Sequence, residues 1–247
     1  MECSTEKVMQ LLTKPVFLKV VITGINLLFL AGLSTFGQER YSFNRKRVNW
    51  GFKAGLNANA MMHLQVMQGE EKLPDASFCN KTGNDIIGFF RINLDRFFIQ
   101  PELGWAKLKY DISFSFPLED DSKRKVGLSF KTQSVNLNGL IGYNITKTGP
   151  FVFNVIVGSS LRYRFDIQYL MQDTGSKYKS SNPAYNPYGL LGFSMNISNV
   201  HFDVRYAISM VTANLNFDPI SDKPDFFEGV TVHKRENILS FSCGVMF

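Results

Sequence analysis

The sequence predicts an all-β chain that folds into a single antiparallel up-and-down transmembrane β-barrel of about eight strands, and three observations support this. From Val48 onward, segments of roughly ten residues alternate apolar and polar side chains, which is typical of strands with two different faces. After this point, uncharged apolar runs stay shorter than a membrane-spanning helix requires. The connections between segments alternate between tight and long, as expected for short periplasmic turns and extended extracellular loops.

Composition agrees with this fold class. The 247 residues suit one domain, and 23 phenylalanines with only 19% charged residues favour strands over helices. The formal net charge is +6, but basic clusters occur only at Arg45 to Arg47 and Lys123 to Lys125, without interleaved aromatics. We therefore expect no nucleic-acid partner. The basic excess suits anionic lipid headgroups or lipopolysaccharide, or simply solvated charge.

Residues 1–37 are predicted to be a secretory signal peptide, because the apolar stretch Val20 to Leu33 follows three lysines. Small residues three and one positions before Gln38 suit cleavage there. A retained N-terminal anchor is the alternative interpretation. After cleavage, residues 38–47 would form a short periplasmic segment and residues 48–247 the outer-membrane β-barrel domain.

The first four strands follow from their side-chain periods. In residues 49–59 the even positions are apolar and the odd positions are polar or glycine. Residues 85–94 and 97–105 again set apolar side chains against Asp, Arg, Gln and Glu. In residues 134–144, valine, leucine, isoleucine and tyrosine alternate with serine and asparagine. Each segment therefore has one apolar and one polar face.

The last four strands repeat the pattern. Residues 151–166 alternate phenylalanine, valine and tyrosine with asparagine, serine and arginine. Residues 186–197 and 200–209 are predicted as strands on the same ground, and residues 239–247 as the closing strand. Tight connections are predicted at Asp95-Arg96, residues 146–150 and Ser198-Asn199, and long loops at residues 68–84, 118–125, 172–182 and 216–236.

A soluble lipocalin-like barrel would share the strand count but place its apolar face inside. The polar face here carries many charges among glycines, while the apolar face is rich in large aromatics, which favours a lipid-facing apolar surface. An interior only eight strands wide is filled by side chains, so we expect paired charges and no solute channel. The predicted barrel-interior polar network contains Lys53, Arg91, Glu102, Arg162, Arg164, Asp203 and Arg205.

Aromatic side chains near strand ends are typical of the girdles that flank the lipid-facing band. The predicted girdle contains Trp50, Trp105, Tyr143, Phe151 and Tyr206. The closing strand carries apolar residues at alternate positions, which resembles the C-terminal signal recognised by the barrel-assembly machinery. That predicted signal contains Phe241, Val245 and Phe247.

Three segments resemble strands of the PorT-like outer-membrane β-barrel family of Bacteroidota. Phe52 to Asn57 resembles its opening strand, Phe98 to Leu103 its third strand, and Asp203 to Tyr206 its seventh. The resemblance extends over residues 48–247. It implies a porin-like membrane fold and, for the branch around PorT itself, a role in type IX protein secretion.

Catalysis would need one of the histidines as a base beside a nucleophile. His201 is predicted on a strand near a periplasmic turn, with Asp203 on the same face and Ser194 or Ser209 as hydroxyls, so a triad can be drawn. His63 and His233 are predicted in extracellular loops, at spacings that do not suit metal ligation.

The remaining candidates for chemistry are few. The acidic run Glu119 to Asp121 would attract a divalent cation, but Lys123 to Lys125 balances it, and no metal site is predicted. Cys79 is predicted in a loop and Cys243 on the last strand, which does not suggest a disulfide framework. We expect no cofactor and no catalytic residue.

The sequence therefore indicates a protein of the cell outer membrane with a structural or interaction role. The expected partners are outer-membrane lipid and lipopolysaccharide, the barrel-assembly machinery during biogenesis, and a protein or glycan at the extracellular loops. The alternatives are an accessory of protein export and a lipid-modifying enzyme.

Overall fold

The computed structural model describes residues 47–68, 71–73, 76–117, 123–146, 151–171, 177–179, 184–216, 218–219 and 230–247. The predicted signal peptide, almost all of the predicted periplasmic segment and the acidic run at residues 119–121 lie outside this part of the chain. Within it, no helix is long and apolar enough to cross a membrane. Its strands are β1 (Val48–Gln68), β2 (Glu71–Lys72), β3 (Ser77–Leu94), β4 (Phe97–Pro117), β5 (Lys123–Asn144), β6 (Phe151–Met171), β7 (Lys177–Lys179), β8 (Ala184–Ile197), β9 (Val200–Ser209), β10 (Ala213–Asn216), β11 (Asp218–Pro219) and β12 (Val230–Met246).

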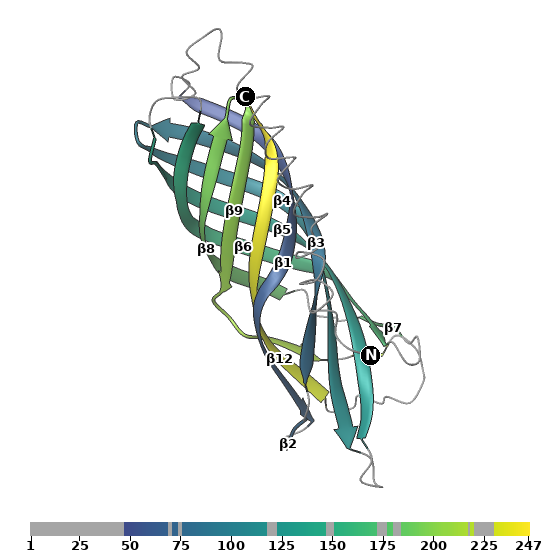
Figure 1. Ribbon diagram of the computed structural model, residues 1–247. Coiled ribbons are helices and arrows are strands. Elements are labelled where there is room, and N and C mark those ends of the chain that lie inside the picture. The colour runs from purple at the N-terminus through teal and green to yellow at the C-terminus, as the bar shows by residue number, and fades with distance from the viewer. Residues whose placement is uncertain are drawn as a thin grey trace, which may run out of the picture.

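Eight of these strands form a closed antiparallel barrel (Figure 1). Sequential neighbours pair in the order β1, β3, β4, β5, β6, β8, β9 and β12, and β12 pairs back onto β1 to close the wall. Closure leaves no unpaired strand edge within the barrel wall, which a hydrocarbon environment would penalise strongly. The predicted up-and-down barrel of eight strands is confirmed.

Most of the barrel strands are longer than the sequence periods predicted, whereas β9 has the predicted bounds, residues 200–209. β4 and β5 pair from Phe97 and Tyr143 at one end to Pro117 and Lys123 at the other, well beyond the roughly 9–11 residues that cross a membrane. The predicted long loops were wrong where they overlap these extensions. Residues 77–84 belong to β3, residues 123–125 to β5, and residues 230–236 to β12.

Three side chains assigned to loops from the sequence therefore lie on strands. His63 is in β1, Cys79 is in β3 and His233 is in β12. The assignment failed because these segments continue the sheet past the height at which a membrane-spanning strand ends.

The tight turns lie at the end of the barrel that holds the C-terminus, at the top of Figure 1. Asp95 (φ 56°) and Ser198 (φ 52°) adopt the left-handed conformation that primed two-residue hairpin turns use at their first central position. Trp50 and Phe247 exchange backbone hydrogen bonds at the same end, with N to O distances of 3.1 and 2.8 Å. The described chain therefore begins and ends at the short-turn side.

Register shifts interrupt three of the longer strands at about one level of the wall. The shifts leave Ala60 on β1 and Phe165 on β6 as extra residues, and they place Thr82 and Gly83 on β3 opposite one residue of β4. Such bulges bend a strand and increase its local twist. They mark the level at which the single barrel wall ends and two separate sheets begin.

Beyond this level the wall divides into two sheets, one carrying β2 and β10 beside β1 and β12, the other carrying β7 and β11 beside β6. Backbone pairing between β1 and β3 stops at Asn57 and Gly83. Just past that point, the Asn80 amide donates to the Asn59 carbonyl (2.6 Å) and accepts from its N–H (3.1 Å). The Asn80 side chain thus takes the place of the next backbone hydrogen-bonded pair between β1 and β3.

Candidate functional site

The outward face of the barrel carries an apolar belt. On β4 it runs from Phe97 to Trp105, and on β5 from Tyr143 to Val135. Its large side chains are exposed, as in Phe193 at 64%. A contiguous apolar surface of this kind is unfavourable in water but suits a lipid environment.

The predicted girdle residues lie on this outer surface, at two levels. Trp50 packs against Phe247 (ring centroids 4.9 Å apart) and Tyr143 against Phe97 (5.1 Å), near the short-turn end. Phe151 begins β6 at this end, half-buried. Three of the five predicted girdle residues, Trp50, Tyr143 and Phe151, therefore lie at the edge of the belt nearest the short turns.

The other two predicted girdle residues lie at the opposite edge of the belt, away from the short turns. Trp105 is the last apolar residue of the belt on β4, and Tyr206 on β9 accepts a hydrogen bond from Asn237 (3.1 Å). A further aromatic pair lies there, Tyr163 and Tyr185, whose ring centroids are 4.8 Å apart.

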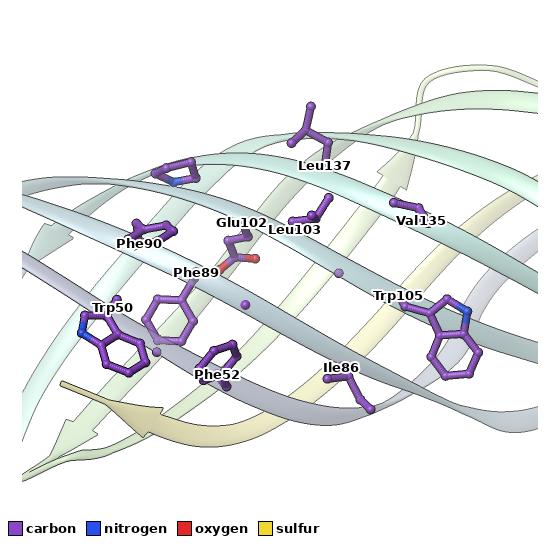
Figure 2. Close-up of a pocket in the computed structure, with 14 residues that line it drawn as sticks. Trp50, Phe52, Ile86, Phe89, Phe90, Glu102, Leu103, Trp105, Val135 and Leu137 are labelled. Carbon is purple, nitrogen blue, oxygen red and sulfur yellow. The ribbon is translucent and has the colours of Figure 1, made fainter.

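A shallow groove of about 640 Å³ crosses the belt between Trp50 and Trp105 (Figure 2). Gly88 and Pro101 leave space between larger neighbours such as Phe52 and Leu103. The register of β3 and β4 omits the Phe90–Pro101 pair, where proline has no N–H to donate. The groove is almost wholly apolar and lies at the height of lipid chains.

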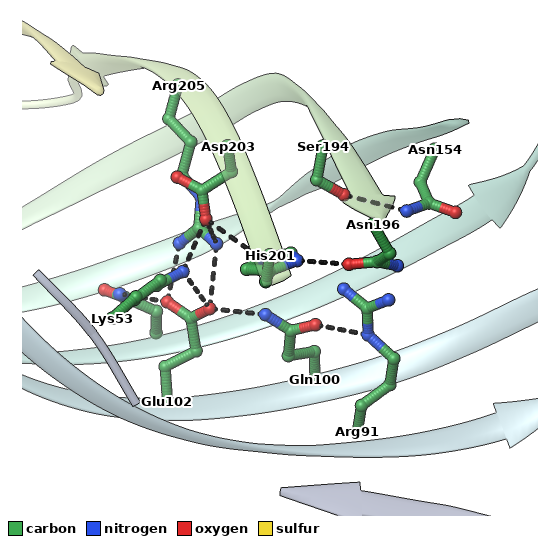
Figure 3. A network of polar contacts seen from close by, with 11 residues as sticks. Lys53, Arg91, Gln100, Glu102, Asn154, Ser194, Asn196, His201, Asp203 and Arg205 are labelled. Atoms are coloured by element: carbon green, nitrogen blue, oxygen red, sulfur yellow. Dashed lines mark hydrogen bonds and ion pairs between the residues drawn. The ribbon is translucent and has the colours of Figure 1, made fainter. Parts of the chain in front are cut away.

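The lumen contains the charged residues predicted from the polar face. At its centre, Lys53 Nζ lies 2.7 Å from Glu102 and 2.6 Å from Asp203 (Figure 3). Arg205 binds the same two carboxylates, at 2.5 Å to Glu102 and 2.7 Å to Asp203. Gln100 and Asn138 donate further hydrogen bonds to Glu102 at 2.6 and 2.9 Å. We call Lys53, Glu102, Asp203 and Arg205 the central ion cluster.

A second layer lies on the short-turn side of this cluster. Arg91 donates to Gln100 (2.6 Å) and stacks over the Phe98 ring at 4.0 Å. His201 is fully buried, with Nδ1 2.5 Å from the Asn196 amide oxygen and Nε2 3.4 Å from Asp203.

A third layer lies toward the opposite end. Arg164 forms an ion pair with Glu236 and donates to the Tyr188 hydroxyl (2.9 Å). Arg162 donates to Asn136 (2.9 Å) and lies over the Tyr188 ring. All seven predicted lumen residues are therefore buried in the barrel interior, and Glu236 is a member that the sequence interpretation missed.

Apolar side chains also meet across the lumen. Leu108, Leu140, Tyr188, Leu190, Ala207 and Ile238 form one buried cluster. These residues come from β4, β5, β8, β9 and β12, so the cluster joins opposite walls. This cluster and the ion pairs place buried side chains at several levels of the lumen.

The triad that can be drawn around His201 is not assembled in the structure. Ser194 accepts a hydrogen bond from Asn154 (3.0 Å), and Ser209 donates to the Val211 carbonyl (2.8 Å). Neither hydroxyl has a hydrogen bond to His201 among the described contacts. In the same part of the chain, no group of three His, Cys, Asp or Glu side chains is placed to hold a metal ion.

Past Trp105 the polarity of the wall inverts. On β4 the outward residues become Lys107, Lys109 and Asp111, whereas Leu108 and Tyr110 point inward and are buried. β5 does the same. The buried apolar residues at this end are Tyr110, Ile112, Phe114, Val126, Leu128, Phe130, Val66 and Leu73.

This polarity is that of a water-soluble β-protein, with an apolar interior and a polar exterior. We call the part of the strands beyond the apolar belt the projecting end. Tyr110 and Phe130 stack within its core at 4.7 Å. The long connections leave from this end, so by the usual asymmetry of such barrels we expect it to face the cell exterior.

A closed barrel with a lipid-facing belt and a charged, side-chain-filled lumen defines an integral outer-membrane β-barrel. The chain matches the outer membrane protein beta-barrel domain family over residues 36–218 and belongs to that family. The protein is therefore a component of the outer membrane. The comparison with curated proteins yields no match.

Several solved structures of outer-membrane proteins are similar to this chain at low identity. OprG from Pseudomonas aeruginosa has a TM-score of 0.52 and 13% identity, covering 82% of this chain and 97% of that one. Ail of Yersinia pestis, solved with the heparin analogue sucrose octasulfate, scores 0.40 at 12% identity, covering 82% and 100%. The outer membrane protease OmpT from Escherichia coli scores 0.42 at 9% identity, covering 86% and 100%.

Proposed function

We propose that this protein is a non-conducting, non-enzymatic outer-membrane scaffold whose projecting end is an interaction surface for a protein or glycan outside the cell. The observation that carries the proposal is the apolar core of the projecting end. A core that includes Tyr110, Phe114 and Phe130 holds the extended strands in one arrangement before any partner binds. A preformed surface avoids much of the entropic penalty of ordering on binding.

The contacts within the lumen favour a scaffold role rather than a channel role. The ion pairs of the central ion cluster join β1, β4 and β9, and the apolar cluster of Leu108 and Ile238 joins opposite walls above them. Opening a path would require breaking several buried ion pairs at once. We therefore expect no single-channel conductance from the purified protein in planar bilayers.

Site-specific crosslinking tests the interaction role. A photoreactive amino acid at Ser77, on the outward face of the projecting end, should form adducts with a protein or glycan in living cells. The same group at Leu137, 58% exposed within the belt, is the matched control and should capture lipid alone. Equal, lipid-only capture at both positions would contradict the proposal.

The PorT-like resemblance supports a second role, as an accessory of type IX protein secretion. It rests on the segments Phe52 to Asn57, Phe98 to Leu103 and Asp203 to Tyr206. The same crosslinking experiment addresses it, since adducts at Ser77 would then contain secretion components. Deletion of the gene would in addition leave secreted cargo in the periplasm.

Lipid modification is the rival from a different class of function. Its base would be one of His63, His201 and His233. If replacing any of them by alanine abolished a measurable deacylation of lipopolysaccharide, the non-enzymatic proposal would fail. The burial of His201 and its bond to Asn196 lead us to expect no such activity from it.

A further inference from the structure

Lysines gather on the outward face of β3, β4 and β5 directly above the apolar belt. The register places Lys81 opposite Lys109, and Lys109 opposite Lys131, so that three lysines cross three adjacent strands in one row. Lys107 lies one step nearer the belt, two residues beyond Trp105. We call these four residues the lysine row.

This arrangement is unfavourable for the protein alone. Side chains directly opposite on neighbouring antiparallel strands have Cβ atoms about 4.5–5.5 Å apart, and like charges in such pairs destabilise the sheet. Lys81 is compensated by Asp111, whose carboxylate lies 2.7 Å from its Nζ and also accepts from Ser129 (2.8 Å). No described carboxylate forms an ion pair with Lys109 or Lys131.

The compensating acid lies on the side of the row that faces away from the membrane. Asp111 is two residues beyond Lys109 on β4, while Trp105 is four residues before it, at the edge of the belt. The uncompensated ammonium groups therefore lie between the edge of the belt and Asp111. Their methylene stems can follow the apolar surface while the charged ends reach the headgroup layer.

We propose that the lysine row binds the phosphate groups of lipid A, the membrane-embedded part of lipopolysaccharide in the outer leaflet. Phosphate oxygens accept hydrogen bonds from several ammonium groups and would bring negative charge to Lys109 and Lys131. The acyl chains of the same molecule would lie against the apolar belt below. This inference goes beyond the scaffold role and needs no partner at the tip of the projecting end.

The test uses the full chain purified from outer membranes and exchanged into zwitterionic detergent. Binding of purified lipid A is measured for the wild type and for Lys109→Gln with Lys131→Gln. The matched control is Lys72→Gln with Arg47→Gln, which removes two exposed charges elsewhere. Each lysine near an anionic lipid surface contributes roughly 1 kcal/mol, so the paired variant should bind about thirtyfold more weakly. The control should stay within about twofold, on the same scale.

Two further measurements separate a specific site from general attraction. Dephosphorylated lipid A should bind the wild type about as weakly as intact lipid A binds the paired variant. Without lipid A, the paired variant should melt at a higher temperature than the wild type, because the cross-strand repulsion is gone. Lipid A should raise the melting temperature of the wild type more than that of the variant.

Several outcomes would overturn the proposal. They are equal affinity of wild type and paired variant, undiminished binding of dephosphorylated lipid A, and a matching loss in the control variant. Phosphatidylglycerol binding as tightly as lipid A at equal charge would also overturn it, since the row would then recognise any anionic headgroup. Crosslinking at Ser77 tests the scaffold role separately, so the two proposals can fail independently.

Discussion

Glu102 receives more hydrogen bonds than its neighbours in the central ion cluster, from Lys53, Arg205, Gln100 and Asn138. Its replacement in Glu102→Gln would leave two buried cations with Asp203 as their shared carboxylate. Removing one partner of a buried ion pair destabilises a protein by about 3–5 kcal/mol. We expect a loss of that size in the free energy of unfolding, measured by urea titration in micelles.

Ser194→Ala is the matched comparison for this variant. It removes one buried neutral hydrogen bond, from Asn154, and should lower the free energy of unfolding by about 1 kcal/mol. If both variants unfolded at the same urea concentration, the ion pairs would not contribute to stability as the structure implies.

Two glycines on β5 provide a sharper contrast. A Cβ at Gly142 would overlap the ring of Phe98, which is fully buried and held by the Arg91 guanidinium. A Cβ at Gly139 would meet nothing within 4 Å. We expect Gly142→Ala to lower the free energy of unfolding by about 1–3 kcal/mol, as overpacking does.

Gly139→Ala should instead be neutral or stabilising, because alanine has less backbone entropy to lose. The temperature at which each variant loses its compact band on gels, after graded heating, compares the two directly. Equal midpoints would show that the lumen adjusts around Phe98 more freely than its packing suggests.

Period-two alternation was sufficient to predict that Lys53, Arg91 and Arg205 belong to the polar face, since a strand's face is set by its parity. It could not predict their partners, because cross-barrel contacts depend on strand tilt. Glu236 was missed for a different reason. It lies on the part of β12 that the sequence interpretation assigned to a loop, although Arg164 needed an anion in the same layer.

Among the strands, β1 and β3 are joined beyond their last backbone pair by the side chain of Asn80. We expect Asn80→Ala to lower local stability by about 1–3 kcal/mol, because two hydrogen bonds to Asn59 are lost. Amide hydrogen exchange of residues 77–82 should then accelerate roughly tenfold or more.

Asn84→Ala is the control on the same strand, since Asn84 is exposed and lies within the paired region. Exchange there should stay close to that of the wild type. Acceleration throughout the barrel in either variant would argue that the projecting end and the barrel do not open separately.

The lengths of the long strands escaped the sequence interpretation because the parity of the apolar positions changes along these strands. On β4 the apolar positions are odd up to Trp105 and even from Ala106 to Phe114. If the odd positions of β4 are expected to be apolar along its whole length, the second half of the strand resembles a charged loop. The change of parity itself was visible, in Lys107, Lys109 and Asp111 alternating with leucine, tyrosine and isoleucine.

For the molecule as a whole, its two described cysteines report orientation. Cys79 lies on the outward side of the projecting end, and Cys243 is exposed on the lipid-facing side near Phe241 and Val245. A membrane-impermeant maleimide should label Cys79 in intact cells and leave Cys243 at background. Cys79→Ser and Cys243→Ser identify which residue reacts.

If Cys79 reacted only after the outer membrane was permeabilised, the projecting end would face the periplasm. Labelling of Cys243 in intact cells would instead contradict the lipid contact of the final strand. The C-terminal assembly signal of Phe241, Val245 and Phe247 stays a prediction, although all three side chains are exposed on the belt.

The whole fold was predictable to the extent that closure and strand order follow from alternation and from short turns. The division into a barrel and a projecting end was not, because it arises from bulges on β1, β3 and β6 that leave no clear sequence signal. Among the residues at the three bulges, Gly83 was the one hint in the sequence.

The inversion of polarity also limits how this protein can change in evolution. An insertion of one residue into the part of β4 between the short turn and Trp105 would reverse the faces of the strand. It would move lumen charges to the lipid side and lipid-facing aromatics into the lumen. Above Lys107, pairs of residues can be added to β4 and β5 together without disturbing either face. Length variation among relatives should therefore concentrate in the outer half of the strands and come in even steps.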